Sequence, residues 1–530
     1  MSSRPHSQFL ARPLDTGGNL VPAVVVGLLC LVPLTLTPVL PFIDFYAHVL
    51  RYYALAHADG SAFASNYRPA WHLLPNLGFD VLGTAILKVI PPLAAARLIA
   101  GLIIVTLYAA VLALARVLHG RIPLLSIALA GILVYSHILV WGFANFLLGL
   151  GLAIGGVAFW IASRDRPRLQ LAVSAAFGLV LIFVHAFAFA VWGLILGGVE
   201  LMLAADAGEL RLRPLAVRAG RLLLLAVVPA LLFLQMPTAT SSEGVTQIGA
   251  NLAGYAAEGR LATRLATEVG RRLDSFLRVA EAFSPPLDRA LGVVLWGTLA
   301  AGLVTGALRL DRRLWVAAAL VFVLVGVMPP NLFGVGHTDD RMPLVLLCLL
   351  AAGLAWQPGA RLAEPVRAAV LGLFVVRFLL VAWGYHQAGV GYRAYLAELA
   401  RLDTGRIGAP ILFDREAGRD RFALRCEPLG PLLALANGTA APTFDNPTQQ
   451  PIALTGALAA AEDRLRAAPP AASVEPPTAA QTVARYLDAG FDTVVTCSLA
   501  PPPAAPSGTA LLAQSPPWAI YGRLPGAGGN

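Results

Sequence analysis

Long apolar runs separated by short polar segments occupy most of the first 386 residues of the chain. Eleven of these runs are long enough for an α-helix to cross a membrane. They cover residues 21–40, 93–115, 122–139, 143–162, 169–186, 188–205, 217–235, 289–308, 314–330, 342–357 and 366–385. The pattern predicts an all-α polytopic membrane protein with about eleven transmembrane helices, followed by a more polar tail.

The arginines predict the orientation of these helices. Lys88 is the only lysine, and the arginines gather in alternate short loops between the apolar runs. Cytoplasmic loops carry the excess of basic residues. We therefore expect the N-terminus in the cytoplasm and the C-terminal tail on the extracytoplasmic side. Arg341 is the exception, because it lies in a short loop that falls outside. The arginine- and alanine-rich composition suggests the inner (plasma) membrane, with the tail in the periplasm.

The same topology divides the chain into two domains. Residues 1–386 form the transmembrane domain, and residues 387–530 form a small soluble extracytoplasmic α/β domain. Three extracytoplasmic loops interrupt the first domain, at 41–92, 236–288 and 331–341. In the tail, strand-like runs stand at 409–413, 492–496 and 519–521, and a helical pattern covers 483–489.

Composition supports the membrane assignment and excludes several functions. The chain is 57% hydrophobic and 13% charged, whereas soluble domains carry about 25% charged residues. The net charge of +9 follows from the loop arginines, so it predicts no nucleic-acid partner. No phosphate-binding glycine loop, dinucleotide fingerprint or paired-histidine zinc motif is present. Cys426 and Cys497 lie in the tail, where they either pair or remain thiols.

The stretch Pro41–Tyr53 is the first candidate site. If a helix starts directly after Ile43, Asp44, His48 and Arg51 fall on one of its faces, just outside the bilayer. Asp44 could accept a proton from an attacking hydroxyl group, or it could cap the helix. A second surface helix is expected over 77–90, with Asp80 and Lys88 among apolar residues.

His48 and Arg51 each allow more than one role. His48 could orient Asp44, bind a metal together with it, or hold a phosphate as an imidazolium ion. An acid and a histidine one turn apart make a weak metal site, because such sites usually need three protein ligands. Arg51 could bind phosphate, or its side chain could extend to lipid headgroups.

The loop Gly334–Arg341 is the second candidate site. It places His337, Asp339, Asp340 and Arg341 directly before an apolar run. An arginine suits a phosphate group, and either aspartate could bind a cation or a sugar hydroxyl. The alternative is a solvated loop in which the acids favour the start of the next helix. Further polar candidates near the outer ends of helices are His137, Asn145, His185, Arg377 and His386.

This arrangement resembles the GT-C superfamily of integral-membrane glycosyltransferases. Pro41–Asp44 followed by two surface helices is similar to their first extracytoplasmic loop, which carries an essential acid just after the first transmembrane helix. The Arg341 loop resembles the acidic or phosphate-binding loop of some members. Many members have two adjacent acids in the first loop, whereas Phe45 follows Asp44 here.

The resemblance implies a membrane glycosyltransferase that uses a polyprenyl-phosphate-linked sugar on the extracytoplasmic face. The acceptor would be an envelope glycan, lipid or protein. Asp44 would be the general base, and Arg341, with His337 or Arg51, would bind the lipid phosphate. A divalent metal is a possible cofactor. The alternatives are a transporter or flippase of a lipid-linked or small polar substrate, and a non-catalytic scaffold for envelope assembly. An enzyme should bring both candidate clusters into one outer-face cavity.

Overall fold

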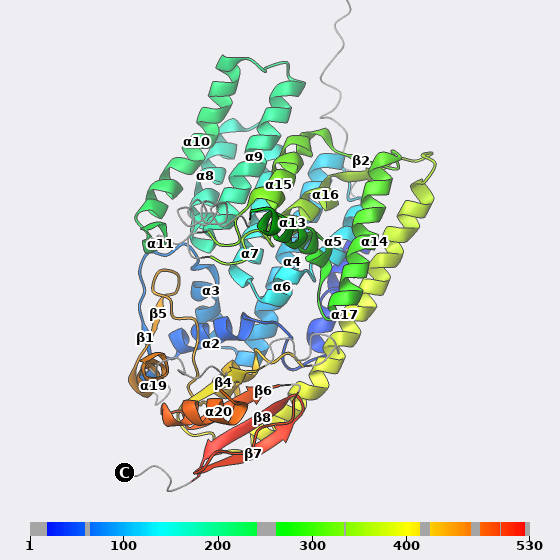
Figure 1. The fold of residues 1–530 in the computed structure, drawn as a ribbon. Helices are drawn as coiled ribbons and strands as arrows, with labels where there is room; N and C mark the ends of the chain where they lie inside the picture. Colours follow the sequence, from blue (N-terminus) through cyan, green and yellow to red (C-terminus); the bar gives the residue numbers. More distant parts are fainter. Residues whose placement is uncertain are drawn as a thin grey trace, which may run out of the picture.

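The computed structural model describes residues 19–58, 64–240, 261–332, 335–413, 424–467, 477–498 and 500–524. Arg4 and Arg12, which enter the predicted orientation, and residues 241–260 of the second loop lie outside these ranges. Figure 1 shows a bundle of helices with a small sheet domain at one end. This is the predicted fold class, a polytopic helical protein with a C-terminal α/β domain.

Eight segments of the described chain are long and apolar enough to cross a membrane. They are α4 (Pro92–His119), α5 with α6 (Leu124–Leu133 and His137–Trp141), α7 (Ala144–Ala162), α8 (Pro167–Val184), α9 (Ala186–Asp206), α10 (Leu212–Leu234), α14 (Pro285–Val304) and α17 (Ala363–Leu399). Each coincides with one of the eleven apolar runs in the sequence.

The other three predicted membrane helices are shorter than the apolar runs that contain them. They are α1 (Leu20–Leu29) with the 3₁₀ turn η1 (Val32–Thr35), α15 (Trp315–Val327), which follows η4 (Arg312–Leu314), and α16 (Met342–Gly353). After α16, the strand β3 (Leu354–Trp356) pairs antiparallel with β2 (Leu308–Leu310). All 12 residues of α16 are buried, so this run is apolar because protein surrounds it. A helix of that length rises about 18 Å, which is less than the bilayer core.

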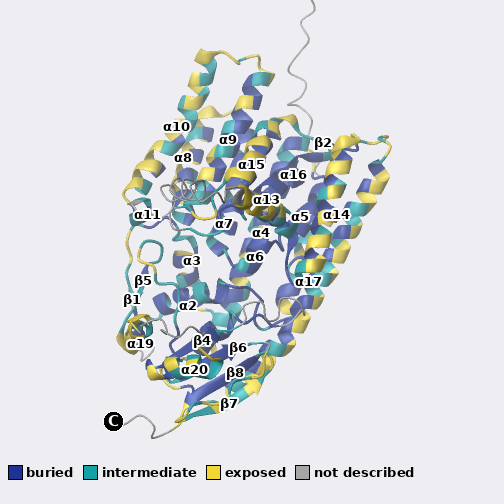
Figure 2. Cartoon of the chain, in the orientation of Figure 1, coloured by how far each residue is buried: buried dark blue, intermediate teal, exposed yellow. Residues whose placement is uncertain are grey.

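The outer helices carry the exposed apolar surface. Figure 2 shows exposed positions along α8, α10, α14 and α17, and buried positions along α4, α5, α7 and α16. Leu224 and Leu234 of α10 are 68% and 67% exposed. A helix with apolar residues on its exposed side suits contact with lipid.

The first predicted loop, residues 41–92, contains two helices where the sequence predicts them. These are α2 (Phe45–Ala56) and α3 (Gly78–Leu87), with η2 (Ala64–Asn66) and β1 (Tyr67–Pro69) between them. The helices pack on each other, and Gly83 of α3 leaves room for the Tyr52 ring, which a Cβ would approach to 2.5 Å. The second loop contains α11 (Pro237–Thr240), α13 (Leu261–Leu277) and η3 (Arg278–Ala280).

The tail forms a four-stranded sheet in the order β4-β6-β8-β7. Its strands are β4 (Gly408–Leu412), β6 (Thr493–Cys497), β7 (Thr509–Ser515) and β8 (Trp518–Arg523), and its helices are α18 (Leu429–Asn437), α19 (Gly456–Ala467) and α20 (Ala479–Asp488). β4 and β6 are parallel, and the other pairs are antiparallel. The sequence predicts β4, β6, β8 and α20, and misses β7.

Three features attach the tail to the bundle. Helix α17 continues without a break through the predicted domain boundary at residue 386 and ends at Leu399. Strand β5 (Ile452–Leu454) pairs antiparallel with β1 of the first outer loop. A disulfide joins Cys426 and Cys497, which is the paired alternative of the two that the sequence leaves open. The tail therefore contacts the surface helices at the end where the candidate residues lie.

Candidate functional site

A cavity of about 270 Å³ lies where α2, the α6–α7 turn, the loop 335–341 and the tail meet. Both candidate clusters of the sequence reach it: Asp44, His48 and Arg51 from the first, and His337 and Arg341 from the second. The rest of the wall consists of Tyr52, Asn76, Trp141, Phe143, Ala144, Asn145, Phe146, His185, Val335, Gly336, Phe444, Gln449 and Gln450. Asp339 and Asp340 do not line it.

Asp44 is held by its main chain against the end of α6. The amide of Ile43 donates to the carbonyl of Val140 at 2.8 Å, and the amide of Asp44 donates to that of Trp141 at 3.0 Å. Gly142 has φ +83°, and a Cβ there would lie 2.5 Å from the Phe45 nitrogen. Only glycine fits this contact. Asp44 precedes α2, but its side chain accepts no capping hydrogen bond from that helix.

Arg51 is buried and paired with an acid from the neighbouring helix. Its Nε donates to Asp80 Oδ1 at 2.6 Å, and its NH2 donates to Asp80 Oδ2 at 3.2 Å. Arg51 and Asp80 are 1% and 0% exposed. Although burial alone would lower it, Asp80 raises the pKa of Arg51. The sequence shows Asp80 only as one polar residue of a surface helix, and the structure identifies it as the counter-ion of Arg51.

His48 is neutral in this arrangement. Its Nδ1 lies 2.9 Å from NH1 of Arg51. Because a guanidinium only donates, Nδ1 is the acceptor and the ring proton is on Nε2. Burial and the charge of Arg51 lower the pKa of His48 well below its usual value. Of the roles expected for His48, the geometry favours a neutral hydrogen-bonding group over a charged imidazolium.

Arg341 is the second buried arginine of the cavity, and the groups that its guanidinium contacts directly are neutral. It is 3% exposed, and its guanidinium lies 4.6 Å from the Phe143 ring and 5.0 Å from the Phe146 ring. It donates to His185 Nε2 at 3.3 Å and to the Gly336 carbonyl at 3.1 Å. Its Nε has no partner. Within the described ranges, no carboxylate forms an ion pair with it.

Burial lowers the pKa of Arg341 to about 9, although Asp340 and Asp339 raise it. The group is still a cation at pH 7. A buried charge without a counter-ion is costly, and an anionic ligand would remove that cost.

The other residues of the second loop hold that loop in place. His337 has φ +56°, its Nδ1 lies 2.9 Å from Asp340 Oδ2, and its ring lies 4.2 Å from the Trp141 ring. Burial raises the pKa of Asp340, but the His337 hydrogen bond, the nearby His137 and the Ser275 hydrogen bond together outweigh burial, so the pKa lies below its usual range. Asp339 is bound by Arg271 and Arg272 of α13.

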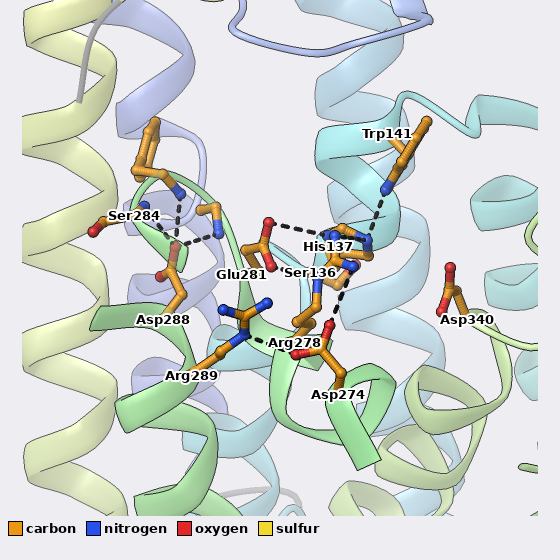
Figure 3. A network of polar contacts seen from close by, with 12 residues as sticks. Ser136, His137, Trp141, Asp274, Arg278, Glu281, Ser284, Asp288, Arg289 and Asp340 are labelled. Atoms are coloured by element: carbon orange, nitrogen blue, oxygen red, sulfur yellow. Dashed lines mark hydrogen bonds and ion pairs between the residues drawn. The ribbon is translucent and has the colours of Figure 1, made fainter. Parts of the chain in front are cut away.

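A buried polar network supports Trp141 from behind the cavity (Figure 3). The Trp141 indole donates to His137 Nε2 at 2.7 Å, and Arg278 of η3 reaches the same nitrogen at 3.2 Å. Arg278 also pairs with Glu281. In the same region, Arg377 pairs with Asp288 at 2.7 Å. His137 and Arg377, two of the polar candidates of the sequence, therefore have partners on neighbouring elements and do not reach the cavity.

The cavity residues do not fit a bound metal ion. Within the described part of the chain, no group of three or more histidine, cysteine, aspartate or glutamate side chains is arranged to hold one. One ring nitrogen of each cavity histidine is already engaged, in His48 by Arg51, in His185 by Arg341 and in His337 by Asp340. We therefore derive no step through a metal.

Several cavity residues were not identified from the sequence. Phe444, Gln449 and Gln450 come from the tail, more than 390 residues after Asp44, and no local pattern marks them. Tyr52 lies one residue after Arg51 in α2, and its hydroxyl is buried without a partner. His185 was expected to have a partner on a neighbouring helix, and that partner is Arg341 of the second loop.

No protein-family model matches this sequence, and a search of curated proteins finds no match. Among solved structures, the chain is similar to the crystal structure of the Archaeoglobus fulgidus oligosaccharyltransferase in complex with Zn and sulfate. The two share 11% sequence identity and a TM-score of 0.42, over 90% of this chain and 67% of that chain. A TM-score below 0.5 supports no inference about the family or the function of this chain.

Proposed function

We propose that the protein is a membrane glycosyltransferase of the GT-C type. It moves a sugar from a polyprenyl-phosphate donor to a glycan, lipid or protein acceptor on the extracytoplasmic face. The observation that carries this proposal is that one cavity holds Asp44 and the guanidinium of Arg341, which forms no ion pair with a carboxylate of the described residues. An acid suits deprotonation of an acceptor, and a buried cation suits a phosphate leaving group.

In this reaction Asp44 acts on the acceptor, and Arg341 acts on the leaving group. The acceptor atom forms a bond to the anomeric carbon of the sugar, and its proton passes to the Asp44 carboxylate. The bond between that carbon and the phosphate oxygen breaks, and its electron pair leaves with the lipid phosphate. Arg341 offsets the charge that develops on this phosphate. Arg51 positions His48 and Tyr52, because Asp80 already neutralises it.

An apolar pocket beside the cavity supports a lipid-linked donor. It has a volume of about 230 Å³ and shares Asn76, His185 and Val335 with the polar cavity. Its remaining wall is mostly aliphatic and aromatic, with Ile182, Phe187, Phe189, Ala230 and Phe233 among its residues. A phosphate bound at Arg341 would thus have an apolar surface next to it for the first isoprene units.

The tail supplies groups that suit a sugar. Phe444 lies 4.9 Å from the His48 ring, and the Gln450 side-chain oxygen is buried without a partner. An aromatic ring and a carboxamide are a common pair for the face and the hydroxyls of a sugar. The disulfide between Cys426 and Cys497 favours an oxidising compartment for this tail, as does the arginine distribution.

The test is sugar transfer by the purified full-length protein from a panel of polyprenyl-phosphate sugars. Wild type is compared with Asp44→Asn, which keeps the shape of the side chain and removes the base. Loss of a general base typically costs a factor of about 10² to 10⁴ in rate. Asp463→Asn is the control, since Asp463 is an exposed acid of α19 outside the cavity.

Transfer that is lost in Asp44→Asn and kept in Asp463→Asn supports the proposal, provided that both variants unfold at the wild-type temperature. Transfer that survives in Asp44→Asn moves the base to another residue. Facilitated movement of a lipid-linked sugar between leaflets without any transfer would favour the flippase alternative.

A further inference from the structure

A second polar cavity lies at the opposite end of the bundle, among α8, α9 and α10. In Figure 1, the connection between α9 and α10 lies at the end of the bundle away from the sheet domain. The cavity has a volume of about 420 Å³. It is lined by Arg164, Gln170, Glu200, Glu209, Arg213, Pro214, Val217, Arg218 and Arg221. The proposed glycosyltransferase site uses none of these residues, so this cavity needs its own explanation.

The floor of this cavity is a fixed, buried hydrogen-bond network. Glu200 of α9 is 7% exposed and accepts from the Trp160 indole at 2.8 Å and from Arg218 of α10. Gln170 is 2% exposed and donates to the Trp160 carbonyl at 2.6 Å. Arg218 also pairs with Glu209. The two acids of the cavity are therefore both engaged by one arginine.

The other three arginines leave an excess of positive charge. Arg221 reaches only the neutral Gln170 oxygen, at 3.2 Å. In the described ranges, no carboxylate pairs with Arg164, Arg213 or Arg221. Arg213 also stands in the first turn of α10, which begins at Leu212. A helix N-terminus favours negative charge, so the cation here is unfavourable without an anion nearby. These observations indicate a site for an anionic group.

The surface around the cavity suits a lipid. Below the arginines, α10 exposes a continuous apolar face that includes Leu223, Leu224, Val227, Val228 and Leu231. Basic pockets between transmembrane helices on the cytoplasmic side are a recurring way to bind anionic headgroups. An anion held at the arginines could therefore continue into acyl chains that lie along α10.

We propose that this cavity binds the phosphate of an anionic phospholipid headgroup, through Arg164, Arg213 and Arg221. The ligand chemistry is a phosphate ester or free phosphate held by guanidinium groups, which offer several donors in a plane. The proposal does not depend on the glycosyltransferase assignment, because it concerns other residues at the other end of the bundle.

The test compares two variants that each remove one arginine from residues 164–168 and one from residues 211–213, at the starts of α8 and α10. Arg164→Gln with Arg213→Gln removes cavity arginines. Arg168→Gln with Arg211→Gln removes arginines outside the cavity, and all four of these arginines are exposed. Both double variants lose two positive charges from the same two regions of the chain. A difference between them therefore reports on binding in the cavity and not on a general effect of charge on orientation or solubility. Arg218 stays, because it neutralises Glu200.

Delipidated full-length protein in neutral detergent is titrated with dihexanoyl phosphatidylglycerol, dihexanoyl phosphatidylcholine and inorganic phosphate. The readout is the midpoint of thermal unfolding, which a ligand of the folded state raises. We expect phosphatidylglycerol, and not phosphatidylcholine, to stabilise wild type and Arg168→Gln/Arg211→Gln. Half-saturation should need about 30-fold more lipid in Arg164→Gln/Arg213→Gln, since each arginine contributes a factor of roughly five.

Stabilisation by phosphatidylglycerol alone, with this dependence on the variants, supports the site with a lipid as its source. The same dependence with inorganic phosphate alone supports the site with free phosphate as its source. Absence of stabilisation by either compound in wild type would overturn the proposal. An equal response of the two double variants would overturn it as well.

Discussion

Helix α2 and the loop 335–341 each bring one buried arginine to the wall of the same cavity. One of these arginines is paired with a carboxylate, and the other contacts only neutral groups. Arg51 of α2 meets Asp80 of α3 through two hydrogen bonds. Arg341 of the loop meets aromatic rings, a neutral histidine and a main-chain carbonyl. Both side chains are at most 3% exposed. Burial alone therefore does not distinguish their roles, and the presence of a counter-ion does.

The comparison distinguishes Arg51, which stabilises the packing of two helices, from Arg341, which we propose binds a ligand. A buried arginine that has its own carboxylate contributes to the packing of two helices, and its removal leaves an unpaired acid. A buried arginine without a carboxylate partner is costly in the empty protein, and under the proposed function it would gain a counter-ion from the bound phosphate. The two arginines should therefore respond to mutation in opposite ways, in stability and in binding.

The largest effect on stability is expected for Asp80→Asn. This change leaves the Arg51 charge buried without a partner, which should lower the free energy of unfolding by about 3–5 kcal/mol. Thermal unfolding in detergent measures it. The double variant Arg51→Met/Asp80→Leu removes both charges and should recover most of the loss. A single variant as stable as wild type would mean that Arg51 needs no counter-ion.

The next effect is expected for Gly142→Ala, which acts on the α2 side of the cavity. The left-handed backbone costs alanine about 1–2 kcal/mol, and the new Cβ would press on the Phe45 nitrogen. We expect Asp44 to shift and sugar transfer to fall by at least about tenfold. Gly193→Ala is the control, because a Cβ at Gly193 of α9 meets nothing within 4 Å. Equal transfer in both variants would contradict the anchoring of Asp44.

The free energy of unfolding should depend on pH through the protonation of His48. Its pKa in the folded protein lies below the usual value near 6.5, so the unfolded chain binds the proton more readily. Stability is then fully present above about pH 6.5 and falls as the pH drops below it, by up to about 1.4 kcal/mol per pH unit. His48→Gln should flatten this slope when unfolding is measured between pH 7 and pH 5. An unchanged slope would mean that His48 is charged in the folded state.

The smallest effect on stability is expected for Arg341→Met. The variant loses two hydrogen bonds donated by a charged group, each worth about 1.5–3 kcal/mol, and the removal of a buried charge without an ion-pair partner offsets this loss. We expect a net change within about 1 kcal/mol in either direction, by the same unfolding measurement. A loss as large as that of Asp80→Asn would show that Arg341 has a structural counter-ion and would remove the contrast with Arg51.

The sequence predicts those features that depend on local pattern. The eight long membrane helices, the two surface helices and three of the four tail strands follow from apolar runs and alternation. The shared face of Asp44, His48 and Arg51 follows from helical spacing. The unusual Arg341 follows from the charge rule, and the structure places it in the same cavity as Asp44.

The features that the sequence does not predict depend on contacts between distant residues. Asp80 becomes the partner of Arg51 only when α3 packs on α2. Asp339 looks like a site residue in the sequence, but it binds the arginines of α13. Gln450 reaches the cavity only because β5 pairs with β1. The apolar run over 342–357 predicts a full membrane helix, whereas α16 is buried by protein and ends at Gly353.

The decisive measurement is the affinity of the purified protein for polyprenyl phosphate, the leaving group of the proposed reaction. It is made with wild type, Arg341→Met and the charge-neutral pair Arg51→Met/Asp80→Leu. Hydrogen bonds to a charged group contribute about 1.5–3 kcal/mol, so Arg341→Met should bind about 10- to 150-fold more weakly, while the pair variant should bind within a few-fold of wild type. Equal binding by wild type and Arg341→Met would contradict the assignment of Arg341 as the phosphate ligand, and with it the proposed site.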